Sequence, residues 1–357
     1  MKRDSVRRMG AATDMSSFLS PLATIYKSAA LTRRALYRRG LLKTNKLNRP
    51  VISIGNLSVG GTGKTPLVAL TAKLALSRGL KPAILTRGYG RGRSTRLIAL
   101  APAANRSPNP RETGDEPALL AAALPEVPIV ISASRYQAGI YAERVFQVDM
   151  HILDDGFQHL QLARDLDVVA LDATQELSDR ALLPAGRLRE PCSALERAQV
   201  IVLTRVELAG AEGLENAVRR VNPSARLFRS RLRLKSLVNI SSGERAAAEA
   251  FRGKSLFAFC GLGNSTAFFR YLERWGFRIV GQHRFPDHHV YTSADTEVLA
   301  RQAAQSQASA LITTEKDMMN LPGGWKPGVD TYACEIEIEI ENPAEFEDAL
   351  FASLRAL

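Results

Sequence analysis

A glycine-rich loop between a predicted strand and a predicted helix constrains this chain more than any other feature. Residues 50–55 (PVISIG) are apolar and β-branched and are bounded by proline and glycine, which is typical of a short buried strand. The loop NLSVGGTGKTP follows at 56–66, and residues 66–78 read as a helix that ends before Gly79. A strand, a glycine-rich loop, Gly-Lys-Thr and a helix in this order form a phosphate-binding loop, or P-loop.

The residue types of this loop suit a nucleotide phosphate. Glycines let backbone N–H groups surround phosphate oxygens without a Cβ in the way, and the helix N-terminus adds its dipole. Lys64 is expected to reach the β- and γ-phosphates, and the Thr65 hydroxyl to bind Mg²⁺. The sequence therefore predicts nucleotide contacts from Gly60, Gly61, Thr62, Gly63, Lys64 and Thr65.

Two positions of the loop depart from known patterns. Ser58 stands where the P-loop consensus has its first glycine, a departure that the flanking strand and helix outweigh. Val59 stands where a related class of partitioning and metal-delivery ATPases has a lysine directly before the glycines. This difference counts against one function that such a P-loop could serve, that of a switch ATPase on a membrane surface.

Strand-like and helix-like segments alternate after the P-loop, as in an α/β fold with a mostly parallel sheet. Predicted strands lie at 81–86, 150–155, 167–172 and 199–204. Near residue 228 the chain becomes an alternating apolar and basic ribbon, and a βαβ unit follows at 254–281. We expect a basic segment at 1–49, a P-loop NTPase-like core at 50–229, and a smaller α/β domain at 230–357 joined by a β-ribbon-like linker.

Carboxylates stand beside predicted elements at two places. Asp154 and Asp155 end a hydrophobic strand, as in a Walker B strand, where an acidic side chain orders Mg²⁺ directly or through water. If the strand continues, they point to opposite faces and have different roles; carboxylates in a surface turn are the alternative. Asp115, in GDEP at 114–117, precedes an Ala/Leu-rich helix. It is either the cap of that helix or the base for an acceptor hydroxyl.

Two loops carry residues that suit phosphate binding. The glycine-rich loop at 87–91 follows a strand and is either a ligand contact or a plain turn. In the loop at 183–191, Arg187 and Arg189 could clamp phosphate and Glu190 could bind Mg²⁺. A solvated loop is the alternative for this second segment.

Two later segments place charge after predicted strands. His288 and His289 follow a proline in FPDHH at 285–289, and adjacent histidines rarely chelate one metal ion well. Packing or metal binding by this pair stays open. The segment at 311–317 ends a strand with charged residues that could face a cleft between the domains.

The positive charge is concentrated at one end of the chain. The formal net charge is +12, but residues 1–49 contain twelve basic and two acidic side chains, a net +10. The other 308 residues are nearly neutral, which argues against a nucleic-acid-binding body. The three cysteines are far apart and form no CxxC pattern, which fits a reducing compartment.

Part of the basic segment reads as an amphipathic helix. Ser20 and Pro21 are typical of a helix start, and residues 18–42 suit a membrane interface, with cations on anionic lipid. A helix packed on the protein's own core is the alternative. The expected apolar face carries Phe18, Leu22, Ile25, Tyr26, Ala29, Leu36 and Tyr37, and the opposite face carries Lys27, Arg34 and Arg38.

These motifs, in this order, resemble those of one family, the tetraacyldisaccharide 4′-kinases or lipid A 4′-kinases. The matching segments are GGTGKTP (60–66), TRGYG (86–90), GDEP (114–117), DDGFQH (154–159), LPAGRLREP (183–191), FPDHH (285–289) and TTEKD (313–317). They extend over residues 52–317, and several are long and unusual. The whole set of motifs is therefore specific for this family, whereas a single motif is not.

The resemblance implies a kinase that transfers the γ-phosphoryl group of ATP to the 4′-hydroxyl of a tetraacylated disaccharide 1-phosphate. It implies that Lys64 and Thr65 hold the triphosphate and Mg²⁺. It further implies that Mg²⁺ is positioned by Asp155 and Glu190, with Asp154 and Arg189 close to the phosphates. Asp115 is then the expected catalytic base, supported across the cleft by His288. The choice of His288 over His289 as the partner of this base rests on register alone.

The resemblance also implies a location in the cell. A member of this family is expected at the cytoplasmic face of the inner membrane, as a peripheral or monotopic protein, with ATP and Mg²⁺ as cofactors. The expected partners are the glycolipid substrate and the membrane surface, which residues 18–42 would contact. Neither a nucleic acid nor a protein partner is expected.

Overall fold

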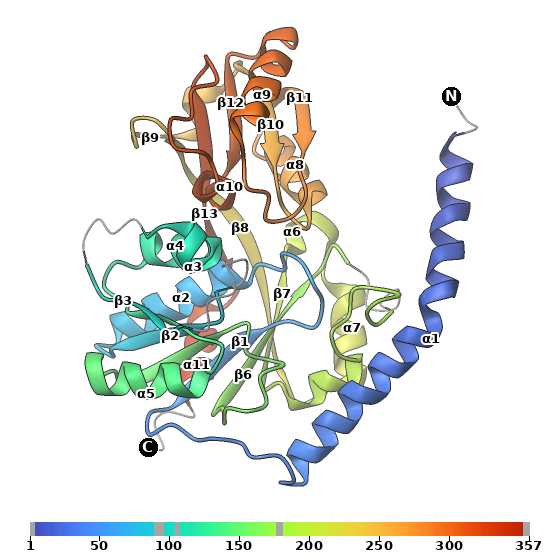
Figure 1. Cartoon of the computed structure of the whole chain (residues 1–357), viewed down its shortest axis with the longest axis vertical. Coiled ribbons are helices and arrows are strands. Elements are labelled where there is room, and N and C mark those ends of the chain that lie inside the picture. The colour runs from blue at the N-terminus through green and yellow to red at the C-terminus, as the bar shows by residue number, and fades with distance from the viewer. Residues whose placement is uncertain (1–3, 89–95, 104–107, 176–180, 353–357) are drawn as a thin grey trace.

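The structure is a computed structural model that describes residues 4–88, 96–103, 108–175 and 181–352 (Figure 1). The Tyr-Gly-Arg end of the predicted loop at 87–91 lies outside these described residues, as does the side chain of Phe18.

Parallel strands form the centre of the core sheet, and an antiparallel strand closes one edge. The order is β7 (Val200–Thr204), β6 (Leu166–Asp172), β1 (Val51–Gly55), β5 (Met150–Asp154), β2 (Pro82–Thr86), β4 (Ile129–Ile131) and the antiparallel β3 (Ile98–Leu100). Helices cover both faces of the central strands, which is why those strands read as continuous apolar runs. The predicted α/β class with a mostly parallel sheet is confirmed.

Two layers of helices bury the core sheet. One face carries α2 (Lys64–Ser77), α3 (Pro110–Thr113), α4 (Asp115–Ala123) and α11 (Pro343–Phe351), and the other carries α5 (Arg135–Phe146), η1 (Cys192–Arg197), α6 (Val206–Ala209) and α7 (Glu212–Val221). Neighbouring side chains of β1 pack against different helix layers. Ile52 and Ile54 pack with α2, whereas Val51 packs with α5.

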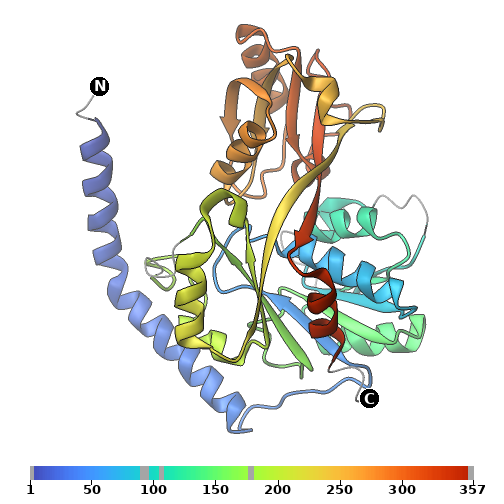
Figure 2. The ribbon, with the colours of Figure 1, turned by 180° about the vertical axis from the view of Figure 1, so that it is seen from behind.

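A long antiparallel ribbon leads from the core to a smaller unit (Figures 1 and 2). Its strands are β8 (Arg226–Asn239) and β13 (Thr331–Ile340), and the short β9 (Arg245–Ala246) pairs with β8. The smaller unit contains η2 (Ala248–Phe251), β10 (Ser255–Cys260), α8 (Ser265–Arg274), β11 (Arg278–Arg284), α9 (Ser293–Gln305), β12 (Ala310–Thr314) and α10 (Glu315–Met319). All strands belong to one 13-stranded sheet among the described residues.

The end of the described chain returns to the core. The helix α11 packs there beneath the ribbon (Figure 2), and the Phe346 and Phe228 rings meet edge to face with centroids 5.2 Å apart. Arg78 Nε donates to Glu347 Oε1 at 2.5 Å. The boundary expected between 229 and 230 falls inside β8, so a continuous strand crosses it.

The N-terminal helix is longer than predicted. It runs over Asp4–Arg38 as α1, so the predicted start at Ser20 and Pro21 is wrong and the proline lies inside the helix. Ser-Pro is a local start signal, whereas the preceding residues include Ala, Met, Leu and Arg, which propagate a helix. A proline removes one helical hydrogen bond and bends a helix, and α1 changes direction along its length (Figure 1). Gly40, with φ 70°, follows the helix end, so the expected span to residue 42 is too long.

The faces of α1 are not divided as predicted. The Tyr26 hydroxyl donates to Arg189 O at 3.0 Å, and Arg34 Nη1 donates to Ser193 O at 3.2 Å. Residues expected on opposite faces therefore both contact the core, because they lie only about 80° apart around the helix axis. Leu22 and Ile25 are instead 53% and 66% exposed. Within the described residues, no helix has both the length and the apolar composition to cross a membrane.

Candidate active site at the carboxyl edge of the core sheet

The P-loop joins β1 to α2 at the carboxyl edge of the sheet, where open α/β sheets bind ligands. Gly60 and Gly63 have φ values of 103° and 83°, in the left-handed region that favours glycine. Asn56 Nδ2 donates to Ser58 O at 2.7 Å and to Thr62 Oγ1 at 2.9 Å. These bonds fix the curvature of the loop.

Side chains from neighbouring segments hold carbonyl oxygens of the P-loop. Arg187 Nη2 donates to Val59 O at 3.1 Å, Arg205 Nη1 to Gly61 O at 2.7 Å, and Thr204 Oγ1 to Thr62 O at 2.9 Å. In a trans peptide the N–H of the next residue points away from the carbonyl oxygen. Anchoring these carbonyls therefore turns the amides that follow them toward the opposite side, where an anion can accept hydrogen bonds.

Two cations from different segments surround the Asp155 carboxylate. Lys64 Nζ lies 3.2 Å from its Oδ1, and Arg189 Nη1 donates to its Oδ2 at 2.6 Å. Burial of this carboxylate opposes ionisation, but the charges of Lys64 and Arg189 outweigh it and lower the pKa of Asp155 to about 2. Asp155 has φ 51°, so β5 ends at Asp154. The condition for the two aspartates to point to opposite faces of the sheet, a strand that continues through Asp155, is therefore not met.

Asp154 has a different environment from its neighbour. Its side chain is buried and accepts a hydrogen bond from Thr86 Oγ1 at 3.0 Å. Burial raises the pKa of Asp154 to about 7, the charges of Glu116 and Asp155 add to this, and Lys64 partly offsets it. The two adjacent aspartates are therefore electrostatically distinct.

The third predicted metal ligand is already in an ion pair. Arg197 Nη1 and Nη2 donate to the two Glu190 oxygens at 2.7 and 2.8 Å, in a bidentate pair. Arg197 also donates to Phe157 O at 2.7 Å, which fixes the guanidinium. Glu190 is thus held in a single orientation, with its remaining lone pairs available.

A carboxylate from α4 and a histidine from the smaller unit meet across the cleft. His288 Nδ1 lies 2.8 Å from Asp115 Oδ2, although the residues are 173 positions apart in the chain. Asp115 is the first residue of α4 and is buried. His289 is directed elsewhere, with Nε2 3.1 Å from Asp295 Oδ2 and its ring stacked on Phe285.

The contact between Asp115 and His288 shifts the pKa of each residue toward its charged form. Burial raises the pKa of Asp115, but the hydrogen bond with His288 and the charge of Lys316 outweigh burial, so the net shift is downward. The hydrogen bond with Asp115 raises the pKa of His288 against the opposing effects of burial and Lys316. Asp115 is consequently an ionised carboxylate near neutral pH and can accept a proton.

Several arginines surround His159, beyond the P-loop. Burial lowers the pKa of this histidine to about 4, and positive charge on Arg135, Arg164, Arg33 and Arg87 adds to the shift. Arg33 comes from α1, where its Nη1 donates to Gln158 O at 3.3 Å. The site therefore has a strongly cationic margin on the side of α1.

The smaller unit touches the P-loop directly. Arg187 Nη2, which holds Val59, also donates to Gly263 O at 3.3 Å. Asn264 Nδ2 donates to Asp172 Oδ2 at 3.1 Å, and Arg205 pairs with the same carboxylate oxygen. A Cβ added at Gly263 would lie 3.2 Å from Gly60 Cα and 2.7 Å from Asp287 Oδ2, so glycine permits this close approach.

Replacing Gly263 with valine should separate the smaller unit from the P-loop. We expect kcat for phosphoryl transfer to fall by at least about tenfold, because displacements near 1 Å disturb catalytic geometry. ATP affinity should change much less. Gly213→Val is the matched control, because a Cβ at Gly213 meets no atom within 4 Å. Equal kcat values for the two variants would contradict the importance of this contact.

Several residues of this site were absent from the sequence-based set. Asp172 and Arg205 stand at the carboxyl ends of predicted strands, which was the available signal. Arg187 was considered as a phosphate clamp, whereas here it holds two backbone carbonyls. Lys316 lies within 3.8 Å of Asp115 Oδ2. It belongs to the segment at 311–317, whose charged residues were considered only as ones that could face a cleft between the domains.

Comparison with known proteins gives one consistent result. The family model described as tetraacyldisaccharide-1-P 4′-kinase matches residues 15–355. A tetraacyldisaccharide 4′-kinase of Geobacter metallireducens is 38% identical over 337 residues, covering 94% of this chain and 97% of the relative. A relative of the same description in Anaeromyxobacter dehalogenans is 41% identical over 304 residues, covering 83% of this chain and 79% of its own length.

A solved structure has the same fold. The crystal structure of LpxK from Aquifex aeolicus, in complex with ATP, matches with a TM-score of 0.77 and 32% sequence identity. The match covers 95% of this chain and 99% of the Aquifex chain. The similarity therefore extends over the core, the ribbon and the smaller unit.

Proposed function

Since this chain belongs to the tetraacyldisaccharide-1-P 4′-kinase family, we propose that its P-loop site transfers the γ-phosphoryl group of ATP to the 4′-hydroxyl of a tetraacyldisaccharide 1-phosphate. The observation that carries this proposal is the contact between the buried Asp115 of the P-loop core and the half-buried His288 of the smaller unit. A hydroxyl acceptor needs such a base, whereas simple nucleotide binding does not.

The triphosphate is bound by the P-loop. Amides of Gly60, Gly61, Thr62 and Gly63 donate to phosphate oxygens, assisted by the N-terminal dipole of α2. Lys64 leaves its contact with Asp155 to reach the β- and γ-phosphates, which carry more negative charge. Arg189, already directed at the same carboxylate, adds positive charge beside the transferring group, and Asp154 lies close to the phosphates.

The protein residues present suit Mg²⁺. Asp155 Oδ1 is buried, and among the described residues its contact is the Lys64 ammonium 3.2 Å away, so its lone pairs become available to a cation once Lys64 turns to the phosphates. Mg²⁺ commonly takes one or two carboxylates together with phosphate oxygens and water. Thr65, Asp155 and Glu190 would hold it, with Arg197 orienting Glu190. The bound ion would neutralise charge on the phosphates.

Asp115 acts as the base. It accepts the proton of the 4′-hydroxyl while the 4′-oxygen forms its bond to the γ-phosphorus. The bond from that phosphorus to the β–γ bridging oxygen breaks, and ADP leaves. Asp115 Oδ2 already accepts a hydrogen bond from His288, and Oδ1 accepts one from Glu116 N at 2.9 Å, which fixes the carboxylate plane. Oδ2 also accepts a hydrogen bond from Asn320 Nδ2 at 3.4 Å, so Oδ1 is the oxygen that retains a lone pair for the substrate.

The margin around His159 suits the other end of the acceptor. A disaccharide 1-phosphate carries an anionic group, and the arginines near His159 provide the matching positive charge. Because Arg33 belongs to α1, this margin connects the kinase site with the N-terminal helix. The same helix is thus placed to meet a substrate that is anchored in a lipid surface.

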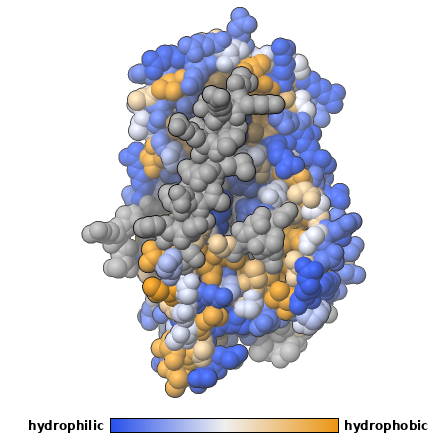
Figure 3. All heavy atoms as spheres, turned by 90° about the vertical axis from the view of Figure 1, so that its right-hand side faces the viewer, coloured by the Kyte–Doolittle hydropathy of each residue, from blue (hydrophilic) through white to orange (hydrophobic). Residues whose placement is uncertain are grey.

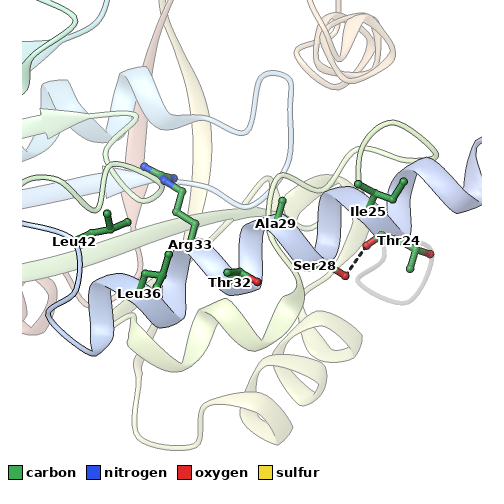
Figure 4. Close-up of a pocket in the computed structure, with 8 residues that line it drawn as sticks. All are labelled: Thr24, Ile25, Ser28, Ala29, Thr32, Arg33, Leu36 and Leu42. Atoms are coloured by element: carbon green, nitrogen blue, oxygen red, sulfur yellow. Dashed lines mark hydrogen bonds between the residues drawn. The ribbon is translucent and has the colours of Figure 1, made fainter.

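The exposed apolar side chains of α1 and the turn after it support membrane docking. Leu22, Ile25, Leu31, Leu41 and Leu42 are between 37% and 68% exposed. Hydrophobic residues gather at the lower end of the molecular face that carries α1 (Figure 3). An open groove of about 560 Å³ runs along the helix, lined in part by Ile25, Leu36 and Leu42 (Figure 4). We infer peripheral or monotopic attachment at the cytoplasmic face of the inner membrane.

Charged substitutions at two of these positions should weaken membrane binding. We expect Leu22→Glu combined with Ile25→Glu to lower partitioning onto anionic phosphatidylglycerol vesicles by more than about tenfold, since burying each side chain is worth about 1.5–3 kcal/mol. Vesicle co-sedimentation measures this. Val145→Glu, on α5 and also about half exposed, is the matched control. Unchanged partitioning of the double variant would contradict docking through α1.

Dependence of ATP consumption on the acceptor tests the proposed function. The purified chain should consume ATP only when the tetraacyldisaccharide 1-phosphate is present in detergent micelles. ATP hydrolysis at the same rate without the acceptor, stimulated instead by lipid vesicles alone, would favour a membrane-surface switch ATPase and overturn the kinase assignment.

A further inference from the structure

Lys316 places a cation beside the Asp115–His288 pair. Its Nζ lies 3.3 Å from His288 Nε2, 3.3 Å from Asp287 Oδ1 and 3.8 Å from Asp115 Oδ2. The residue is the second of α10, which packs against α4, the helix that begins with Asp115. Its side chain is mostly buried, so these contacts are not made by a loose surface lysine.

Hydrogen-bond chemistry fixes the protons of this group. A lysine ammonium can only donate, so the nitrogen that faces it, His288 Nε2, must be an acceptor without a proton. The single proton of a neutral imidazole then sits on Nδ1, where it points at Asp115 Oδ2, 2.8 Å away. A doubly protonated ring would instead place an N–H against the ammonium.

We propose that Lys316 is a positioning residue that opposes a second proton on His288 and holds the ring's single proton on Nδ1, so that the ring keeps the ionised Asp115 aimed at the substrate hydroxyl. This inference rests on the proposed function, because it concerns the base of that reaction. Lys316 acts through His288 and Asp115.

The surrounding charges support this role. The charged groups that face His288 are Asp115 on α4, Asp287 on its own loop and Lys316 on α10, and Glu116 on α4 faces Lys316. Burial lowers the pKa of Lys316, but the three carboxylates outweigh burial and raise it, so the ammonium persists. Removing this ammonium would leave Asp115 and Asp287 beside the imidazole with no opposing cation and favour a second proton on the ring.

The backbone near Lys316 is rigidly held. Asp317, the next residue, is buried and accepts hydrogen bonds from Gly261 N at 2.7 Å and the Tyr291 hydroxyl at 2.8 Å. These bonds join α10 to the end of β10 and to the loop that carries His288. The position of the ammonium is therefore set by the fold of the smaller unit.

The test is the pH profile of transfer by Lys316→Met. The charge of Lys316 lowers the pKa values of Asp115 and His288, so its loss raises both. The reaction needs ionised Asp115 and neutral His288, and the acid limb of kcat/KM should therefore move to higher pH, by about one unit. Lys316→Arg, which keeps the charge, should retain the wild-type limb. Lys326→Met, an exposed lysine of the same unit, is the control.

A spectroscopic readout separates this role from a structural one. ¹⁵N NMR of the labelled protein at pH 9, above the raised pKa of His288, should show the neutral Nδ1–H form in the wild type, with the His288 signals assigned through His288→Gln. The Lys316→Met variant should show a larger doubly protonated fraction, and folding is checked by its ATP affinity. If that variant does not fold, Lys316→Gln takes its place.

Three results would overturn the inference: an acid limb that does not move in Lys316→Met, an Lys316→Arg profile that matches Lys316→Met, or the Nε2–H form in the wild type. These failures leave the kinase assignment intact if the wild type transfers phosphate and Asp115→Asn does not. Absence of transfer by the wild type would instead remove the proposed function itself.

Discussion

Asp115→Asn should lower the rate of phosphoryl transfer by about 10²–10⁴-fold, the range that general base catalysis contributes. The amide cannot accept the hydroxyl proton at neutral pH, although its size and its place at the start of α4 are unchanged. ATP affinity should stay near the wild-type value, because Asp115 belongs to the acceptor side of the site. Single-turnover transfer and equilibrium ATP binding measure the two quantities separately.

Glu126→Gln is the matched control for this variant. Glu126 is an exposed carboxylate shortly after the same helix, so its loss removes one negative charge without touching the cleft. Near-normal turnover of Asp115→Asn would show that the assigned base is wrong. A parallel loss of ATP binding would place Asp115 on the nucleotide side instead.

Lys64→Met should lower kcat by about 10²–10³-fold, comparable to removing one donor that stabilises charge in a transition state. It should also weaken ATP binding, because the ammonium no longer reaches the β- and γ-phosphates. Asp155 keeps its 2.6 Å bond with Arg189, so the protein should remain folded. Transfer kinetics at saturating ATP, with nucleotide affinity measured separately, distinguish the two effects.

Lys73→Met provides the comparison for this second variant. Lys73 lies on the same helix, α2, but its side chain is exposed. It should behave as the wild type in both assays. If Lys64→Met retained wild-type kcat at saturating ATP, the lysine would contribute only to ground-state binding.

The P-loop could be predicted from sequence because all of its signals are contiguous. Strand, loop and helix lie within residues 50–78, and the structure has β1 and α2 at these positions. Local composition also identified the strands that end at Asp154, Asp172 and Thr204. Each is an apolar run, as a parallel strand buried on both faces requires, and each ends in a polar residue.

Contacts between distant segments had no local signal. Asp115 and His288 are 173 positions apart, and their pairing was expected only from a family resemblance. The return of α11 to the core depends on Phe346 meeting Phe228, which no spacing rule encodes. The true start of α1 was missed because Ser20 and Pro21 form a start signal that tertiary context can override.

The most direct test of the central claim is the position of the new phosphate. The full chain is incubated with ATP, Mg²⁺ and tetraacyldisaccharide 1-phosphate in detergent, and tandem mass spectrometry locates the phosphoryl groups on the product. We predict one added phosphoryl group at the 4′-oxygen, and none with Asp115→Asn. Phosphate added at another position, or ATP consumed with the disaccharide unchanged, would contradict the account.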